Sequence, residues 1–133
     1  MSATPSTALS LPTAMRFITA PTSGGPEVMS ISTGPLPAVG DHDVLIKVAF
    51  AGVNRPDIAQ RSGTYAPPPG ASAIMGLEVS GEVVAVGAQA SRWKLGDRVC
   101  ALTPGGGYAE YCVAPAAHCL PIPHNLALLE AAA

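Results

Sequence analysis

Polar side chains gather where the most apolar segment of the chain, residues 44–53, ends. Asn54 and Asp57 follow this segment directly, and Tyr65 comes shortly afterwards. Residues at the end of a rigid strand often carry function, and side chains of these types act through hydrogen bonds. The local alternative is that Asn54 caps a helical turn and Asp57 favours its positive end. Spacing alone favours this local alternative.

Other types of catalytic or metal chemistry find little support in the sequence. The motifs contain no Ser–His–Asp set, no HExxH and no pair of carboxylates at catalytic spacing. The three histidines are far from any second ligand, and the odd number of cysteines without a CxxC pair argues against a disulfide framework and a thiolate zinc site. Such cysteine usage fits a reducing cytoplasm. The residues are His42, His118, His124, Cys100, Cys112 and Cys119.

The stretch GLEVSGEVVAVG at residues 76–87 reads as a strand that glycine interrupts. Its valines favour a pleated strand. Gly76 and Gly81 mark either bends or a close approach of another backbone or a ligand, whereas Gly87 marks a bend. A buried Glu78 would need a partner, because an unpaired buried charge is very costly. Its role is either a salt bridge to an arginine or the shaping of a site.

Length and composition describe one small domain with an apolar core. The chain has 133 residues, 48% of them hydrophobic, and a net charge of −2. This balance gives no basis for binding nucleic acid or an anionic membrane, and no apolar stretch approaches the roughly 18 residues that cross a bilayer. Residues 1–14 lack the features of a secretory signal and are expected to be a disordered extension.

GGGYAE does not supply the glycine pattern of a dinucleotide-binding loop, and a P-loop is absent.

Alternating apolar residues separated by Gly- and Pro-rich turns predict a mainly β domain, a small barrel or sandwich. One short helical turn is expected within residues 54–63, and a final helix within 126–133. The strands are expected within residues 15–20, 28–33, 44–53, 77–86, 90–102, 108–116 and 118–123.

Six stretches become recognisable when they are taken together: GGPEVM, VLIKVAFAGVNRPDIAQRSGTYAPPPGA, MGLEVSGEVVAVG, WKLGDRVCAL, GGGYAEYCVAP and LPIPHNLALLEAAA. Their sequence resembles the amino-terminal half of a medium-chain quinone oxidoreductase, in the subgroup that includes zeta-crystallin-like and p53-inducible quinone oxidoreductases. The resemblance runs from Met15 to Ala133, in order and at the expected spacings.

This resemblance implies a GroES-like, partly open barrel with short helical turns over residues 15–123. Residues 124–133 would begin a linker helix to a Rossmann domain that binds NADPH. The implied reaction transfers a hydride or electrons from NADPH to a quinone, which binds in the cleft between the two domains. The whole protein is expected to be a homodimer.

The matched motifs resemble the zinc-free members of the family. Zinc-dependent relatives place a histidine ligand in a G-H-E triplet, where this chain has Leu77, and a cysteine where it has Asn54. The four-cysteine structural zinc loop is also missing. Without a Lewis acid to polarise an alcohol, reduction of an already electrophilic acceptor is expected.

The resemblance also assigns roles to the polar residues of the first motif. Asn54, Asp57 and Tyr65 match residues that line the cleft near the nicotinamide and are the expected catalytic residues, with no metal ligand. Asn54 would hydrogen-bond the cofactor or the acceptor, and Tyr65 would orient an acceptor oxygen or stack on a ring. The protein would mostly supply positioning, because a quinone can take up protons from water after the hydride arrives.

The length of the chain leaves several functions open. As part of a longer quinone oxidoreductase, the 133 residues alone are expected to be inactive. The alternatives are an enoyl or alkenal reductase of the same family, or a stand-alone GroES-like module that binds a partner or self-associates. Ala127 stands where the family usually has a capping Ser or Thr before Glu130, so the final helix is expected to start loosely.

Overall fold

The computed structural model describes residues 10–133, so most of the extension expected at residues 1–14 lies outside the described part. Two antiparallel sheets dominate it, and no closed barrel forms among the described residues, in agreement with the mainly β, open architecture that the sequence predicts. One sheet pairs β1 (Ala14–Thr19) with β2 (Ser30–Pro35). The other has the order β6–β3–β4–β5–β7, with β3 at Asp43–Ala51, β4 at Glu78–Val86, β5 at Arg98–Leu102, β6 at Tyr111–Pro115 and β7 at Cys119–Pro121.

The apolar core is centred on β3 and β4, the longest strands of the five-stranded sheet. Ile46, Val79 and Val83 are fully buried there. Trp93 packs into the same cluster, and its indole N–H donates to the Ala116 carbonyl oxygen at 2.9 Å, which satisfies the polar end of a buried aromatic side chain. The core therefore fixes the end of β3, after which the predicted site residues follow.

The helix after β3 is longer than the single turn that the sequence predicts. α1 spans Arg55–Ser62, begins after the extended residue Asn54, and ends at Gly63, whose φ of 89° closes the helix in the left-handed region. Asp57 lies in the first turn and accepts the Asn54 backbone N–H at 3.0 Å. A proline within the first turn and a carboxylate bonded to the N-cap residue stabilise this start.

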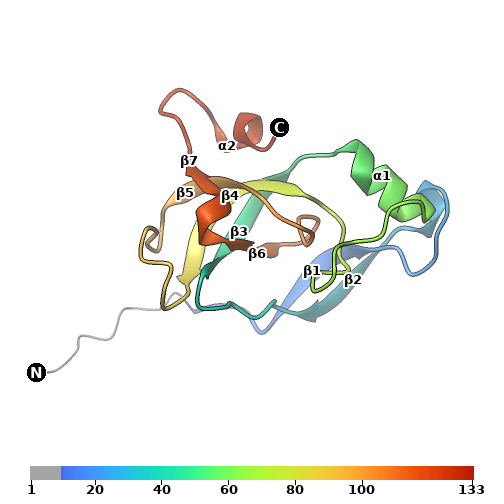
Figure 1. Ribbon diagram of the computed structural model, residues 1–133, viewed down its shortest axis with the longest axis horizontal. Helices are drawn as coiled ribbons and strands as arrows, with labels where there is room; N and C mark the ends of the chain where they lie inside the picture. The colour runs from blue at the N-terminus through green and yellow to red at the C-terminus, as the bar shows by residue number, and fades with distance from the viewer. Residues whose placement is uncertain (1–9) are drawn as a thin grey trace, which may run out of the picture.

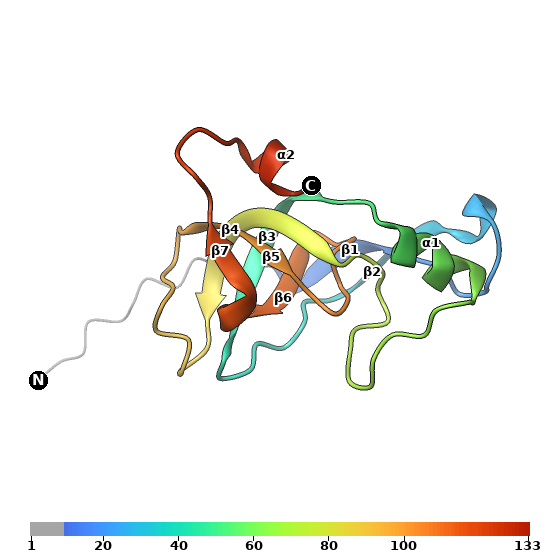
Figure 2. The same cartoon turned by 45° about the horizontal axis from the view of Figure 1, so that its top comes forward.

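The helices α1 and α2 lie apart from each other, α1 beside the two-stranded sheet and α2 beside the five-stranded sheet (Figures 1 and 2). α1 lies next to the turn between β1 and β2, where the Gly24 N–H donates to the Arg61 carbonyl oxygen. α2 (Leu128–Ala131) packs against β3, β4 and β5, and the Ser80 hydroxyl donates to the Leu128 carbonyl oxygen. Ala127 offers no side-chain cap, as expected, and Glu130 reaches its N–H only at 3.4 Å.

Short 3-10 helices at Pro26–Val28 and Ala116–His118 connect strands. Within residues 10–133 no helix is both long enough and apolar enough to cross a membrane.

Candidate functional site

Asn54 and Asp57 lie at the junction of β3, α1 and β4. The chain leaves β3 through Gly52, whose N–H donates to the Glu78 carbonyl oxygen at 3.0 Å. This bond fixes the start of α1 beside the start of β4. The structure therefore brings together two sequence motifs that are separated by more than twenty residues, the one around Asn54 and the one around Glu78.

The Asn54 side chain makes a hydrogen bond across this junction and does not cap the helix. Its amide Nδ2 donates to Glu78 Oε1 at 3.0 Å, and no side-chain capping bond forms. Glu78 thus pairs with an amide, and the salt bridge to an arginine that the sequence offered as one option is not formed. The second amide hydrogen of Asn54 has no acceptor within residues 10–133. Asn54 and Glu78 are both only half-buried.

Asp57 is a buried carboxylate, 4% exposed. Its Oδ2 accepts the Asn54 backbone N–H at 3.0 Å and the Tyr108 hydroxyl at 2.6 Å. The other oxygen, Oδ1, is buried without a hydrogen-bond partner within residues 10–133. This geometry makes Asp57 a fixed acceptor within the protein, because the group is almost fully buried and one of its oxygens already binds two donors.

Tyr108 is the member of this cluster that the sequence did not predict, because no spacing rule links it to Asp57. The only sequence signal for this contact comes from a glycine that packs against the Tyr108 backbone. Gly76 has a φ of 103°, and a Cβ there would lie 2.6 Å from the Tyr108 backbone nitrogen. A Cβ on Gly81 would meet the Lys47 carbonyl oxygen, so both glycines permit the close approach of another backbone that the sequence suggested. Gly87, expected only to bend the strand, also lies against the backbone at residue 40.

Tyr65 stands apart from the cluster. It lies in the loop after α1, 36% exposed, and its hydroxyl makes no hydrogen bond within residues 10–133. Asn54, Asp57 and Glu78 therefore form one network with Tyr108, whereas Tyr65 is free to contact a molecule that approaches from solvent.

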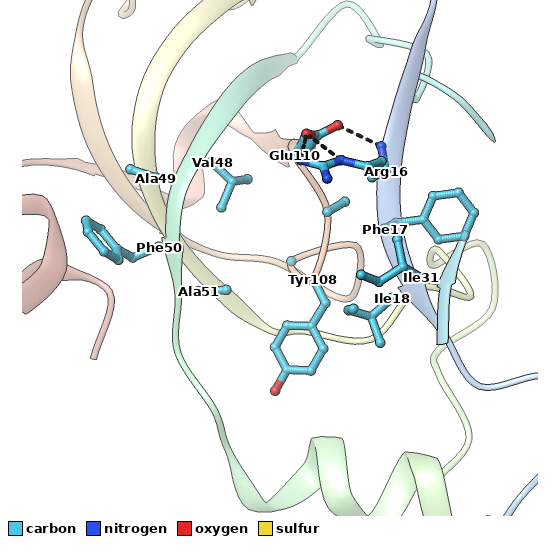
Figure 3. Close-up of a pocket in the computed structure, with 12 residues that line it drawn as sticks. Arg16, Phe17, Ile18, Ile31, Val48, Ala49, Phe50, Ala51, Tyr108 and Glu110 are labelled. Carbon is cyan, nitrogen blue, oxygen red and sulfur yellow. Dashed lines mark hydrogen bonds and ion pairs between the residues drawn. The ribbon is translucent and has the colours of Figure 1, made fainter. Parts of the chain in front are cut away.

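A largely apolar cavity of about 430 Å³ lies between β3 and the β1–β2 sheet (Figure 3). Its charged residues, Arg16 and Glu110, pair with each other at 3.0 Å. The Tyr108 ring borders this cavity and also a second one of about 180 Å³, which Asp57 lines. The first cavity has apolar walls contributed by Phe17, Ile18, Ile31, Val48, Phe50 and others. It suits an uncharged, flat or apolar molecule.

The environment of Tyr108 keeps its hydroxyl protonated. Burial raises the pKa of this phenol well above its ordinary value, and the hydrogen bond to Asp57 and the negative charges of Asp57 and Glu78 raise the pKa further. Tyr108 is therefore a permanent donor to Asp57 at physiological pH.

A spectrophotometric titration checks this protonation state. The difference in phenolate absorbance between the wild type and Tyr108→Phe should show a phenol that ionises above the ordinary tyrosine pKa of about 10. Because the folded state favours the protonated form, the raised pKa of Tyr108 stabilises the fold fully below about pH 10 and loses this effect as pH rises through the folded value. A difference spectrum that titrates near pH 10 or below, about the ordinary value, would contradict the buried bond to Asp57.

The positions at which zinc-dependent relatives have ligands hold other groups here. Leu77 has an apolar side chain, its carbonyl oxygen accepts the Thr103 N–H at 2.9 Å, and Asn54 is bonded to Glu78. Among residues 10–133 there is no group of three or more His, Cys, Asp or Glu side chains that could hold a metal ion.

Comparisons with known proteins agree with this architecture. The alcohol dehydrogenase GroES-like domain matches residues 40–124. A quinone oxidoreductase from Lama guanicoe is 45% identical over 102 residues, covering 75% of this chain and 31% of the relative. A trans-enoyl reductase from Penicillium oxalicum is 37% identical over 134 residues, covering 92% of this chain and 35% of the relative.

The fold of this chain is also similar to that of a solved structure. A mycobacterial protein in complex with NADPH has a TM-score of 0.75 and 36% identity, over 86% of this chain and 34% of that one. The chain thus spans about a third of the length of the relatives it matches. Because the domain match covers well over half of its residues, the chain belongs to the alcohol dehydrogenase GroES-like domain family.

Proposed function

We propose that this chain is the acceptor-side domain of an NADPH-dependent, zinc-independent quinone oxidoreductase. Residues 15–123 form the domain, and residues 124–133 lead towards the cofactor domain of the whole protein. The similarity to quinone oxidoreductases and to a structure in complex with NADPH supports this assignment.

The Asn54–Glu78 hydrogen bond carries the proposal. At 3.0 Å it joins the two motifs in which zinc-dependent relatives place metal ligands, and it leaves an amide N–H uncommitted beside a half-buried junction. An N–H at this place can donate to the carbonyl oxygen of a quinone. The hydrogen bond would become stronger as negative charge develops on that oxygen, which is how oriented donors lower a barrier.

NADPH, when bound, supplies the hydride. The residues of this chain bind and orient the acceptor: Asn54 donates to its oxygen, Tyr65 contacts it from the solvent side, and Asp57 holds the backbone of Asn54 in place. No group of the cluster is free to act as a general acid, because the Tyr108 proton is bonded to Asp57. After hydride transfer the hydroquinone anion takes up one proton, from water.

The whole protein should oxidise NADPH when 1,4-naphthoquinone is added, and its rate should not change after dialysis against EDTA or 1,10-phenanthroline. The physical reason is that the acceptor is polarised by an amide N–H and no metal is required. The measurement is the decrease in nicotinamide absorbance with and without chelator. A rate that depends on added zinc would refute the zinc-independent mechanism.

The similarity to a trans-enoyl reductase makes reduction of an activated alkene the second candidate. The same amide N–H would then donate to the carbonyl oxygen of an enone or enoyl thioester. A value of kcat/KM that is larger for a 2-alkenal or an enoyl thioester than for naphthoquinone would favour this candidate.

A further inference from the structure

Tyr108 joins several segments that are far apart in the sequence. Its N–H donates to the Met75 carbonyl oxygen at 2.9 Å, and its carbonyl oxygen accepts the Ile18 N–H at 2.9 Å. Its hydroxyl donates to Asp57 Oδ2 at 2.6 Å. The backbone of this residue is thus held on two sides, so the phenol extends from a fixed origin to the first turn of α1.

The hydrogen bonds continue from Tyr108 to the reacting region of the proposed site. Asp57 Oδ2 binds the Tyr108 hydroxyl and the Asn54 backbone N–H, and the Asn54 side chain binds Glu78. Without the hydroxyl, the buried carboxylate of Asp57 would keep a single donor, because its other oxygen has no partner within residues 10–133. An under-bonded buried carboxylate is costly, so Asp57 would shift towards other donors or water and take Asn54 with it.

We propose that Tyr108 is a positioning residue of this site, which holds Asn54 in its active orientation through Asp57. This inference rests on the proposed function of Asn54 as the donor to the acceptor oxygen. Tyr108 does not touch the reacting atoms in this role. Its ring borders the apolar cavity, and its hydroxyl points away from Arg16 and Glu110 (Figure 3). The hydroxyl donates a hydrogen bond to Asp57.

Tyr108→Phe tests the inference, because it keeps the ring that borders both cavities and removes only the hydroxyl. Tyr111→Phe is the matched control, since the Tyr111 hydroxyl makes no hydrogen bond within residues 10–133. The chain has two asparagines, Asn54 and Asn125, so selective ¹⁵N-asparagine labelling reports their side-chain amides separately. In Tyr108→Phe the Asn54 amide resonances should shift and those of Asn125 should not, and Tyr111→Phe should shift neither.

The whole protein provides the kinetic readout. In Tyr108→Phe, kcat for naphthoquinone reduction should fall about tenfold, the size expected when a hydrogen bond to a charged group is lost. The KM for the quinone should stay within about twofold, because the misplaced donor acts in the transition state. The shape of the pH profile should be unchanged, since Tyr108 transfers no proton to the acceptor.

Several outcomes would overturn the inference. An unshifted Asn54 amide or an unchanged kcat would remove the positioning role, and loss of the alkaline limb of the pH profile would make Tyr108 a proton donor instead. If Tyr108→Phe fails to fold, Asp57→Asn weakens the same bond from its other end and is measured in the same two ways. A wild-type protein that reduces neither quinones nor alkenes contradicts the proposed function, whereas an active wild type with an equally active Tyr108→Phe contradicts only this inference.

Discussion

Replacing Gly76 with alanine is expected to destabilise the fold by about 3 kcal/mol, from a left-handed backbone and a steric clash together. Gly76 has a φ of 103°, where an L side chain is strained. Its new Cβ would lie 2.6 Å from the Tyr108 backbone nitrogen and 2.7 Å from the Gly107 Cα. These neighbours are backbone atoms and cannot rotate away, so the two segments must separate. Urea unfolding followed by tryptophan fluorescence measures the change.

Gly96→Ala is the matched control for this substitution. Gly96 also has a positive φ, 90°, but a Cβ there would meet nothing within 4 Å. Alanine should therefore cost only the backbone strain, about 1 kcal/mol. Equal losses for the two variants would show that the approach of residues 76 and 107–108 is not tight, and would weaken the case that Tyr108 is held by its backbone.

The sequence predicted most of the strands because their signals are local. Branched apolar residues in β3 and β4, with Gly and Pro between elements, place these strands without knowledge of their partners. The length of α1 was underestimated, although the bond from the Asn54 backbone to Asp57 and the left-handed Gly63 that bound it are local features within the range expected for the helical turn. The strand expected over 108–116 begins only at Tyr111, since Tyr108 instead bonds to Met75 and Ile18.

The site shows the same division between local and long-range information. Asn54 and Asp57 were predicted as site residues because they follow a strong strand and match a motif. Tyr108 could not be found, because its bond to Asp57 joins residues 51 apart in the chain. The Asn54–Glu78 bond was missed for the same reason, although a carboxylate in an apolar strand did signal that a partner was needed. Hydrogen bonds between motifs become visible only when the register of β3 and β4 is known.

The substitution Asn54→Asp should produce the largest loss of activity. It replaces an N–H donor by a carboxylate at the place where Asn54 now bonds to Glu78 Oε1 at 3.0 Å. Two carboxylates at this distance repel each other, so the unfolding free energy should fall by about 2 kcal/mol. The variant also has no N–H to offer the acceptor oxygen, and kcat/KM for the quinone should fall about a hundredfold.

Adding Glu78→Gln separates the two consequences, because the glutamine amide can donate to the new carboxylate at position 54 and restore the bond in the reverse direction. The double variant, Asn54→Asp with Glu78→Gln, should recover stability to within about 1 kcal/mol of the wild type but should not recover the rate. Glu78→Gln alone should change stability little, because its amide oxygen still accepts from Asn54.

Wild-type kcat/KM in the double variant would show that the Asn54 N–H does not act on the acceptor. Unchanged stability in Asn54→Asp would show that the bond to Glu78 contributes nothing. Restored stability with a lost rate is the result expected if Asn54 serves both the fold, through its bond to Glu78, and the reaction, through its second amide hydrogen.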